Sequence, residues 1–180
     1  VQGPKSFDLM ADLLGDWVRA LKYFWFKETS LNGIPFVLAR TGWSKQGGYE
    51  LFLQDGKYGD QLWETIMEAG EKYNIQPGTP CWIERIESGL LNYWEDVSEA
   101  TNPYEVGLEK FVDLDQDVDF IGKEALKKIK AEGIKRKLVG LILHTERLTQ
   151  TAEFWAIESD GQVSGMISSA VYSPDLDKNL

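Results

Sequence analysis

The 180-residue sequence contains only one cysteine and one histidine. These two residues are too few for a disulfide framework, a zinc finger or a His/Cys metal cage, so we expect no bound metal. Basic residues are also scarce, because 19 lysines and arginines stand against 29 aspartates and glutamates and leave a net charge of −10. This balance argues against nonspecific binding to nucleic acid or to an anionic membrane, since both require a basic surface.

The sequence also lacks long hydrophobic runs. Its longest uncharged apolar stretches, such as residues 138–143, fall far short of the roughly 20 residues that cross a bilayer. The first residues include neither an initiator methionine nor the apolar stretch of a signal peptide. We therefore expect a cytoplasmic location and an internal fragment of a longer protein. The hydrophobic content of 43% is enough to build a core.

Hydrophobic periodicity and turn signals predict a mixture of helices and strands. We expect helices at residues 6–14, 58–73, 79–91 and 122–133, and strands at residues 20–27, 34–40 and 49–54. The dipeptide Asn32-Gly33 predicts a tight hairpin turn between two of these strands.

The character of the sequence changes after Arg136. From there, apolar strand-like segments continue toward the end, interrupted by a turn signal at Asp160-Gly161. A basic stretch that contains a glycine precedes the change. We therefore expect one domain over residues 1–130 and a second over residues 137–180.

Three possible chemical signals are weak. His144 has no nucleophile motif beside it, so the sequence does not indicate a catalytic triad. The acidic run at 113–120 partly resembles a calcium loop, but Val118 occupies the position where such a loop needs glycine. The glycine-rich loop at 41–48 lacks the Gly-Lys-Ser/Thr ending of a phosphate-binding loop.

Tryptophan is unusually frequent, with seven residues. Trp43 lies within the loop at 41–48, and loops carry function more often than they carry core. Trp25 lies in the predicted strand 20–27, where it would share one face with Tyr23 because side chains alternate along a strand. Aromatic faces near acidic groups suit a flat heterocycle or an organic cation.

Six segments along the chain match the motifs of one protein family. They are VQGPKS (1–6), ARTGWSKQGGYEL (39–51), WIERIESGLLNY (82–93), NPYEVGLEKFV (102–112), DFIGKEAL (119–126) and SSAVYSPDLDKN (168–179). In this order they resemble the folate-dependent aminomethyltransferase family, which includes the T-protein of glycine cleavage. The resemblance implies an α+β fold, in which a folate-binding domain with a ferredoxin-like α/β part is followed by the start of a C-terminal β-barrel domain. It also implies that both domains are partial.

Three departures from the family pattern narrow the resemblance. Trp43 stands where the family has tyrosine, Gln46 where it has an acidic residue, and Cys81 where it has arginine. With these residues the chain resembles the branch that transfers an S-methyl group from dimethylsulfoniopropionate to tetrahydrofolate. An aminomethyltransferase of glycine cleavage, or a noncatalytic folate-binding protein of the same fold, is the alternative.

The resemblance implies tetrahydrofolate as the methyl acceptor and places four residues at the folate: Trp43, Glu50, Arg85 and Tyr93. Because aromatic faces attract a sulfonium, we expect the methyl donor to be lined by Trp25, Trp43 and Tyr49, with Tyr93 as a further candidate. We identify no catalytic residue, since holding donor and acceptor in line can be enough for methyl transfer. The expected partners are small molecules, and a homodimer is left open.

Overall fold

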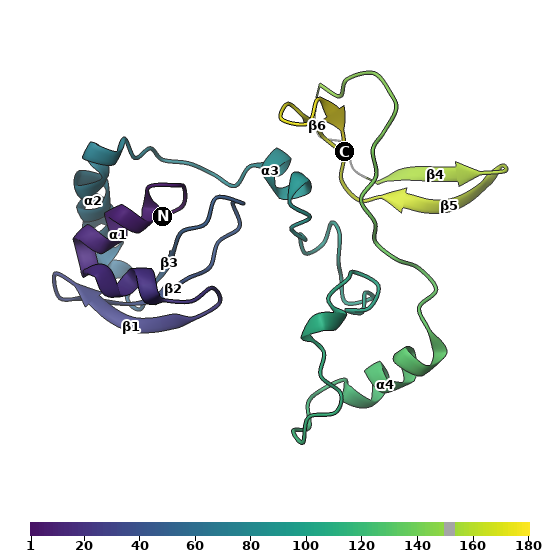
Figure 1. Cartoon of the computed structure of the whole chain (residues 1–180), viewed down its shortest axis with the longest axis horizontal. Helices are drawn as coiled ribbons and strands as arrows, with labels where there is room; N and C mark the ends of the chain where they lie inside the picture. Colours follow the sequence, from purple (N-terminus) through teal and green to yellow (C-terminus); the bar gives the residue numbers. More distant parts are fainter. Residues whose placement is uncertain (150–153) are drawn as a thin grey trace. The chain divides into compact units, whose positions relative to one another are not determined.

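The structure, a computed structural model, describes residues 1–149 and 154–180. It divides into two compact units, Val1–Arg85 and Ile86–Leu180, and each is described by itself (Figure 1).

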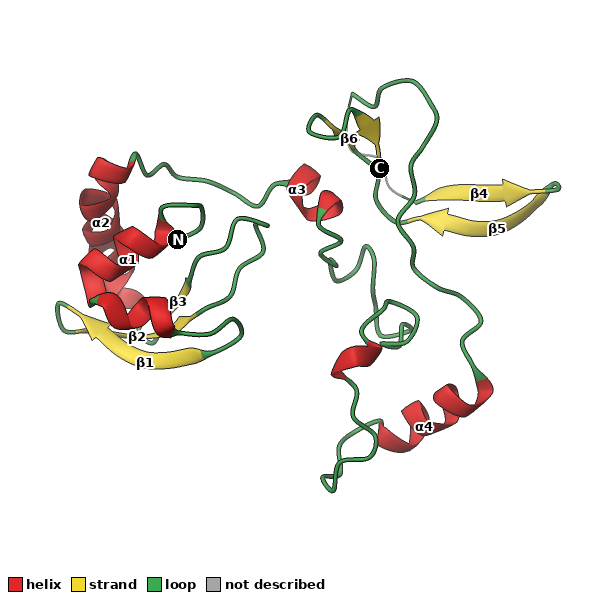
Figure 2. Ribbon diagram, viewed as in Figure 1, coloured by secondary structure: helices red, strands yellow, loops and turns green. Residues whose placement is uncertain are grey.

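The first unit consists of short helices around a three-stranded antiparallel sheet of order β1-β2-β3 (Figure 2). Its elements are α1 (Ser6–Leu14), a 3₁₀ helix (Asp16–Ala20), β1 (Phe26–Leu31), β2 (Ile34–Ala39), β3 (Glu50–Leu53), a 3₁₀ helix (Gly56–Tyr58), α2 (Gly59–Gly70), a 3₁₀ helix (Glu71–Tyr73) and α3 (Trp82–Glu87), whose last two residues belong to the second unit. The helices predicted at 6–14 and 58–73 and the strands predicted at 34–40 and 49–54 are confirmed, with shorter ends for three of the four.

The hairpin predicted from Asn32-Gly33 is confirmed. The two residues have φ angles of 52° and 79°, and positive φ at both central positions is what a type I′ turn requires. This turn matches the twist of its flanking strands, so Leu31 before the turn pairs with Ile34 after it.

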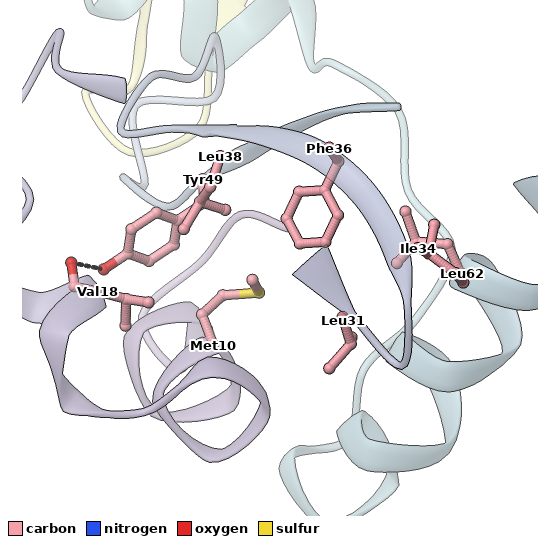
Figure 3. Close-up of a cluster of buried hydrophobic side chains, with 8 residues drawn as sticks. All are labelled: Met10, Val18, Leu31, Ile34, Phe36, Leu38, Tyr49 and Leu62. Atoms are coloured by element: carbon pink, nitrogen blue, oxygen red, sulfur yellow. Dashed lines mark hydrogen bonds between the residues drawn. The ribbon is translucent and has the colours of Figure 1, made fainter. Parts of the chain in front are cut away.

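The hydrophobic core of the first unit lies against one face of β2 (Figure 3). Ile34, Phe36 and Leu38 alternate along this strand and therefore point to the same side, where each is at most 1% exposed. The complete cluster consists of Met10, Val18, Leu31, Ile34, Phe36, Leu38, Tyr49 and Leu62. Because full burial of a large apolar side chain contributes roughly 1.5–3 kcal/mol, this cluster is the main source of stability in the unit.

The strand predicted at 20–27 is wrong for most of its length. β1 begins only at Phe26, and Phe24 has a φ of 66°, which an extended strand cannot contain. The N–H of Trp25 donates to the carbonyl oxygen three residues earlier, as in a turn. Tyr23 and Trp25 therefore do not share a strand face.

α3 is shorter than the helix predicted at 79–91. It runs from Trp82 to Glu87. Gly89 follows with a φ of 64°, a left-handed conformation that commonly ends helices, and its N–H donates to the carbonyl of Ile86. Local backbone geometry at this glycine explains the early end.

The second unit has less regular structure than the first. Its remaining elements are a 3₁₀ helix (Glu109–Phe111), α4 (Lys123–Glu132), β4 (Trp155–Ser159), β5 (Gln162–Ile167), β6 (Tyr172–Ser173) and β7 (Lys178–Asn179). α4 confirms the helix predicted at 122–133, and the turn predicted at Asp160-Gly161 joins β4 to β5. Among the described residues these strands form two separate antiparallel pairs, so the β-barrel stays a prediction.

The first strand-like segment after Arg136, KLVGLILH (137–144), does not form the expected strand. Within residues 137–144, the structure has a single bridge, from Leu143 to Asn179. Residues 150–153 of the run lie outside the described residues. No helix within the described ranges has the length and apolar character needed to cross a membrane.

The two compact units do not follow the boundary predicted between residues 130 and 137. In the second unit, Arg136 donates to the carboxylate of Glu105 at 3.1 Å, and the N–H of Leu138 donates to the Glu105 carbonyl at 2.7 Å. These bonds join the expected linker to the segment before it, and the two compact units meet after Arg85. The domain boundary near residues 130–137 stays a prediction.

Candidate functional site

The N-terminal segment fixes the loop between β2 and β3, residues 41–48. The side-chain amide of Gln2 donates through Nε2 to the carbonyl oxygens of Thr41 at 3.2 Å and Tyr49 at 3.1 Å. Its Oε1 accepts a hydrogen bond from the hydroxyl of Ser44 at 2.7 Å. One side chain therefore bridges both ends and the middle of the loop.

Two glycines allow this close approach. A Cβ added at Gly42 would overlap the side-chain amide of Gln2, and a Cβ added at Gly48 would overlap the backbone of Val1 and Gln2. Gly48 also has a φ of +144°, which L side chains rarely adopt. The glycines of the loop thus serve close packing against the N-terminal segment.

Glu50 begins β3 two positions after the end of the loop and is half-buried. Its carboxylate accepts a hydrogen bond from the hydroxyl of Thr41. Because the two residues stand at opposite ends of the loop, this bond closes the loop at its base and orients the carboxylate. An ionised acceptor held in this way binds an N–H donor roughly twice as strongly as a neutral acceptor does.

The first turn of α3 supplies a second set of contacts to the same loop. The rings of Trp43 and Trp82 lie 6.2 Å apart at 80°, the edge-to-face geometry that aromatic pairs favour. The guanidinium of Arg85 lies 4.6 Å from the centre of the Trp82 ring and 5.8 Å from that of Trp43. Gln46 donates through Nε2 to Glu84 at 2.6 Å. The loop is therefore anchored on two sides.

This part of the first unit combines a fixed carboxylate, two indole rings and a guanidinium. The combination suits a flat heteroaromatic ligand that donates N–H groups, or an organic cation that meets an aromatic face. Across residues 1–149 and 154–180, no group of three or more His, Cys, Asp or Glu side chains could hold a metal ion. The single histidine, His144, is exposed.

The structure brings together two of the residues predicted at the folate. Trp43 and Arg85 share one cluster, and Glu50 lies at the base of the same loop. Whether they bind folate stays a prediction.

Sequence reasoning missed three residues that shape this site. Trp82 precedes Arg85 by three positions on a helix, a spacing that places both side chains on one face, so it could have been found once Arg85 was chosen. Gln2 and Thr41 each lie within a matched segment, but they are 39 positions apart, and nothing local in the sequence indicates what they contact. Their roles arise only when distant segments meet.

Tyr49 and Trp25, both predicted at the methyl donor, differ in burial, and neither belongs to the cluster of Trp43, Trp82 and Arg85. Tyr49 is fully buried in the core, its hydroxyl donates to the carbonyl of Val18 at 2.8 Å, and burial raises the pKa of its phenol. These contacts favour a packing role. Trp25 is 56% exposed in the turn before β1, with the ammonium of Lys22 4.9 Å from its ring centre. Its predicted contact with the donor stays untested.

Tyr93 belongs to the second unit. It is exposed and packs edge to face against Trp94, with ring centres 4.8 Å apart. Its predicted contact with folate also stays a prediction.

Known proteins resemble the chain along its whole length. It is 38% identical over 180 residues to a dimethylsulfoniopropionate demethylase of Ruegeria pomeroyi and 35% identical over 184 residues to an aminomethyltransferase of Thermoanaerobacter pseudethanolicus. Each alignment covers 100% of this chain and 49% of the relative. The chain therefore spans about half the length of the curated relatives it matches.

A solved structure supports the fold. The crystal structure of the glycine cleavage system aminomethyltransferase T from Bartonella henselae matches 99% of this chain and 48% of its own, with a TM-score of 0.76 and 21% identity. This likeness shows a shared mixed helix-and-sheet fold. The family of the GCVT N-terminal domain matches residues 1–116. The motifs, the fold and this match together place the chain in the GCVT family of aminomethyltransferase-like proteins.

Proposed function

We propose that the whole protein transfers one methyl group from the sulfonium of dimethylsulfoniopropionate to N5 of tetrahydrofolate. The products are methylmercaptopropionate and 5-methyltetrahydrofolate. The observation that carries the proposal is the 38% identity over the entire chain to a dimethylsulfoniopropionate demethylase. The substitutions Trp43, Gln46 and Cys81, which depart from the aminomethyltransferase pattern, support the same reading.

The residues of the loop fit a folate. The pterin ring of tetrahydrofolate presents N–H donors, and the half-buried carboxylate of Glu50, oriented by Thr41, is an acceptor suited to them. The indole of Trp43 offers a face or an edge to a flat ring. When bound, the folate supplies N5 as the nucleophile that accepts the methyl group.

The reaction needs no nucleophilic side chain from the protein. One sulfur–methyl bond breaks with its electron pair staying on sulfur, the methyl carbon becomes bonded to N5, and N5 releases a proton. The substrate is already activated by its positive charge, so no serine, cysteine or histidine nucleophile is needed. The side chains must hold sulfur, carbon and nitrogen in line and exclude water, and such positioning can supply roughly 7–11 kcal/mol of the barrier reduction.

Aromatic faces suit the sulfonium because its charge is spread over methyl groups, and each face is worth about 0.5–2 kcal/mol. The guanidinium of Arg85 already lies 5.8 Å from the centre of the Trp43 ring. Since like charges repel, we place the sulfonium on the side of Trp43 away from Arg85. Trp25, which is exposed, is the second candidate for this role.

The alternative is aminomethyl transfer in glycine cleavage, favoured by relatives of that name at 32–35% identity. The test is an activity assay of the whole protein with each donor and tetrahydrofolate. We expect 5-methyltetrahydrofolate from dimethylsulfoniopropionate and no turnover of an aminomethyl donor carried by the glycine-cleavage machinery. Turnover of the aminomethyl donor alone would replace the proposal with the alternative. Folate binding without turnover of either donor would indicate a noncatalytic folate-binding protein.

A further inference from the structure

We infer that Trp82 is a positioning residue, which holds the indole of Trp43 in the orientation that meets the methyl donor. The expected effect on KM for the methyl donor rests on the proposed function, whereas the expected pairing of the two indoles does not. Trp82 opens the matched segment 82–93, where no role was predicted for it. Its proposed task is specific, because it acts through Trp43 and does not itself touch the donor.

The first argument is that the loop cannot hold Trp43 by itself. Residues 41–48 form neither a helix nor a strand, and three of them are glycines with little side chain to pack. Gln2 fixes the path of the backbone through Thr41 and Ser44. These bonds leave the direction of the Trp43 side chain to other contacts.

The second argument is that α3 provides those contacts from a single turn. The Trp82 ring meets the Trp43 ring at 6.2 Å and 80°. The Arg85 guanidinium lies within 6 Å of both ring centres, so one cation ties the two indoles together. The bond from Gln46 to Glu84 fixes the loop three residues further on. Three independent contacts thus join one helical turn to residues 43–46.

The third argument is the exposure of Trp82. It is 36% exposed although it is a large apolar residue, while Arg85 on the same helix is only 2% exposed. A tryptophan at the start of a six-residue helix adds little to a core. Its ring packs against the Trp43 ring and the Arg85 guanidinium, which is the arrangement expected of a support for the loop.

The structural test is a double-mutant cycle read by circular dichroism. Two indoles this close couple their transitions and add a paired positive and negative signal to the spectrum. We expect Trp43→Phe and Trp82→Phe each to remove the same signal, and the double variant to remove no more. The control Trp63→Phe, an exposed tryptophan on α2, should leave this signal in place. Unequal or additive losses would overturn the inference.

The kinetic test compares Trp82→Leu, Trp82→Phe and the control Trp63→Leu in the whole protein. An aromatic pair of this kind corresponds to about a 2- to 12-fold change in an equilibrium constant. We expect Trp82→Leu to raise KM for dimethylsulfoniopropionate by that factor, with a smaller change in kcat. Trp82→Phe should restore KM to within about 2-fold of wild type, because a phenyl edge replaces the indole edge.

The outcomes separate this inference from the proposed function. If the wild type turns over the sulfonium but Trp82→Leu behaves like Trp63→Leu, the inference fails and the function stands. If the wild type does not turn over the sulfonium, the proposed function fails and takes the kinetic consequence with it, while the dichroism cycle still decides whether Trp82 and Trp43 form the pair that the inference requires. If Trp82→Leu does not fold, the Trp82→Phe variant and the cycle decide in the same way.

Discussion

Different kinds of contact stabilise the interior of each of the two units. The first unit has a cluster of eight buried apolar side chains drawn from α1, α2, the sheet and the segments between them. The described part of the second unit buries few large apolar side chains, chiefly Leu114 and Val171. Its segments are joined instead by polar contacts, such as Arg136 with Glu105 and Asn179 with the carbonyls of Thr145 and Glu146.

This difference bears on function, because the candidate site belongs to the unit with the core. Tyr49 is fully buried, and the next residue, Glu50, carries the oriented carboxylate. A close-packed core next to a functional residue fixes the backbone that carries it, and the hydroxyl of Thr41 then orients the carboxylate. The second unit offers no comparable foundation among its described residues.

The largest expected effect compares one substitution in both units. Leu38→Ala removes a completely buried side chain from the core cluster, and we expect it to lower the free energy of unfolding by an amount near the top of the usual 2–5 kcal/mol range. Leu114→Ala in the second unit should cost about 2 kcal/mol or less, because a loosely packed site can collapse into the space. Denaturant unfolding of the whole protein measures both losses. Equal losses would mean that the units do not differ in packing as described.

The second prediction separates the site from the core. Glu50→Gln should leave the free energy of unfolding nearly unchanged but weaken tetrahydrofolate binding by roughly 1.5–3 kcal/mol, because a charged hydrogen-bond acceptor becomes neutral. Calorimetry of the whole protein measures the affinity. The matched control is Glu28→Gln, an exposed position on β1 of the same sheet. An unchanged affinity in Glu50→Gln would remove Glu50 from the proposed site.

The third prediction decides whether Tyr49 packs in the core or contacts the methyl donor. Tyr49→Phe deletes the hydroxyl that donates to Val18, but the Val18 carbonyl still accepts from the N–H of Leu21. We therefore expect a loss of about 0.5–1.5 kcal/mol in the free energy of unfolding. The KM for dimethylsulfoniopropionate should not change. A raised KM with unchanged stability would restore Tyr49 to the donor site, as the sequence predicted.

The smallest expected effect concerns an ion pair of the second unit. Arg136 lowers the pKa of Glu105 through its hydrogen bond, while partial burial opposes this. A lowered pKa in the folded state stabilises the protein at pH values above the unfolded pKa of about 4.3, and this contribution is lost as the pH falls through the folded pKa. Since the Arg136 side chain is 64% exposed, we expect only about 0–1 kcal/mol.

The check on this pair is the pH dependence of unfolding in Glu105→Gln. Between pH 6 and 7 the variant should be slightly less stable than wild type, and the difference should vanish at acidic pH. The exposed Lys127–Glu124 pair on α4 supplies the control Glu124→Gln. A difference that grows as the pH falls would contradict the assigned direction of the pKa.

The sequence predicted features that depend on neighbouring residues. The hairpin at Asn32-Gly33 follows from the backbone freedom of two adjacent residues, and α4 follows from periodicity and a closing glycine. The loop motif pointed to Trp43 and Glu50 and the segment 82–93 to Arg85, and the structure places all three at the same loop, although their contact with folate stays a prediction. These predictions needed no knowledge of how distant segments meet.

The predictions that failed depend on tertiary context. Residues 20–27 have strong strand propensity, yet the turn at Phe24 interrupts them, since packing can override propensity. The burial of Tyr49 also depends on tertiary context, because its hydroxyl meets Val18, 31 positions away. Its predicted contact with the methyl donor stays a prediction. The boundary expected near residue 130 stays a prediction, although the bond from Arg136 to Glu105 joins residues on its two sides.

The central claim, that the loop at 41–48 with Glu50 is the ligand-binding site, is tested most directly by hydrogen–deuterium exchange on the whole protein, with and without tetrahydrofolate. Ligand contacts raise the free energy needed to open the backbone locally and so slow exchange. The account predicts slower exchange at the amides of residues 41–50 when tetrahydrofolate is present, and unchanged exchange in the β4–β5 hairpin. Exchange at residues 41–50 that does not respond to saturating tetrahydrofolate would contradict it.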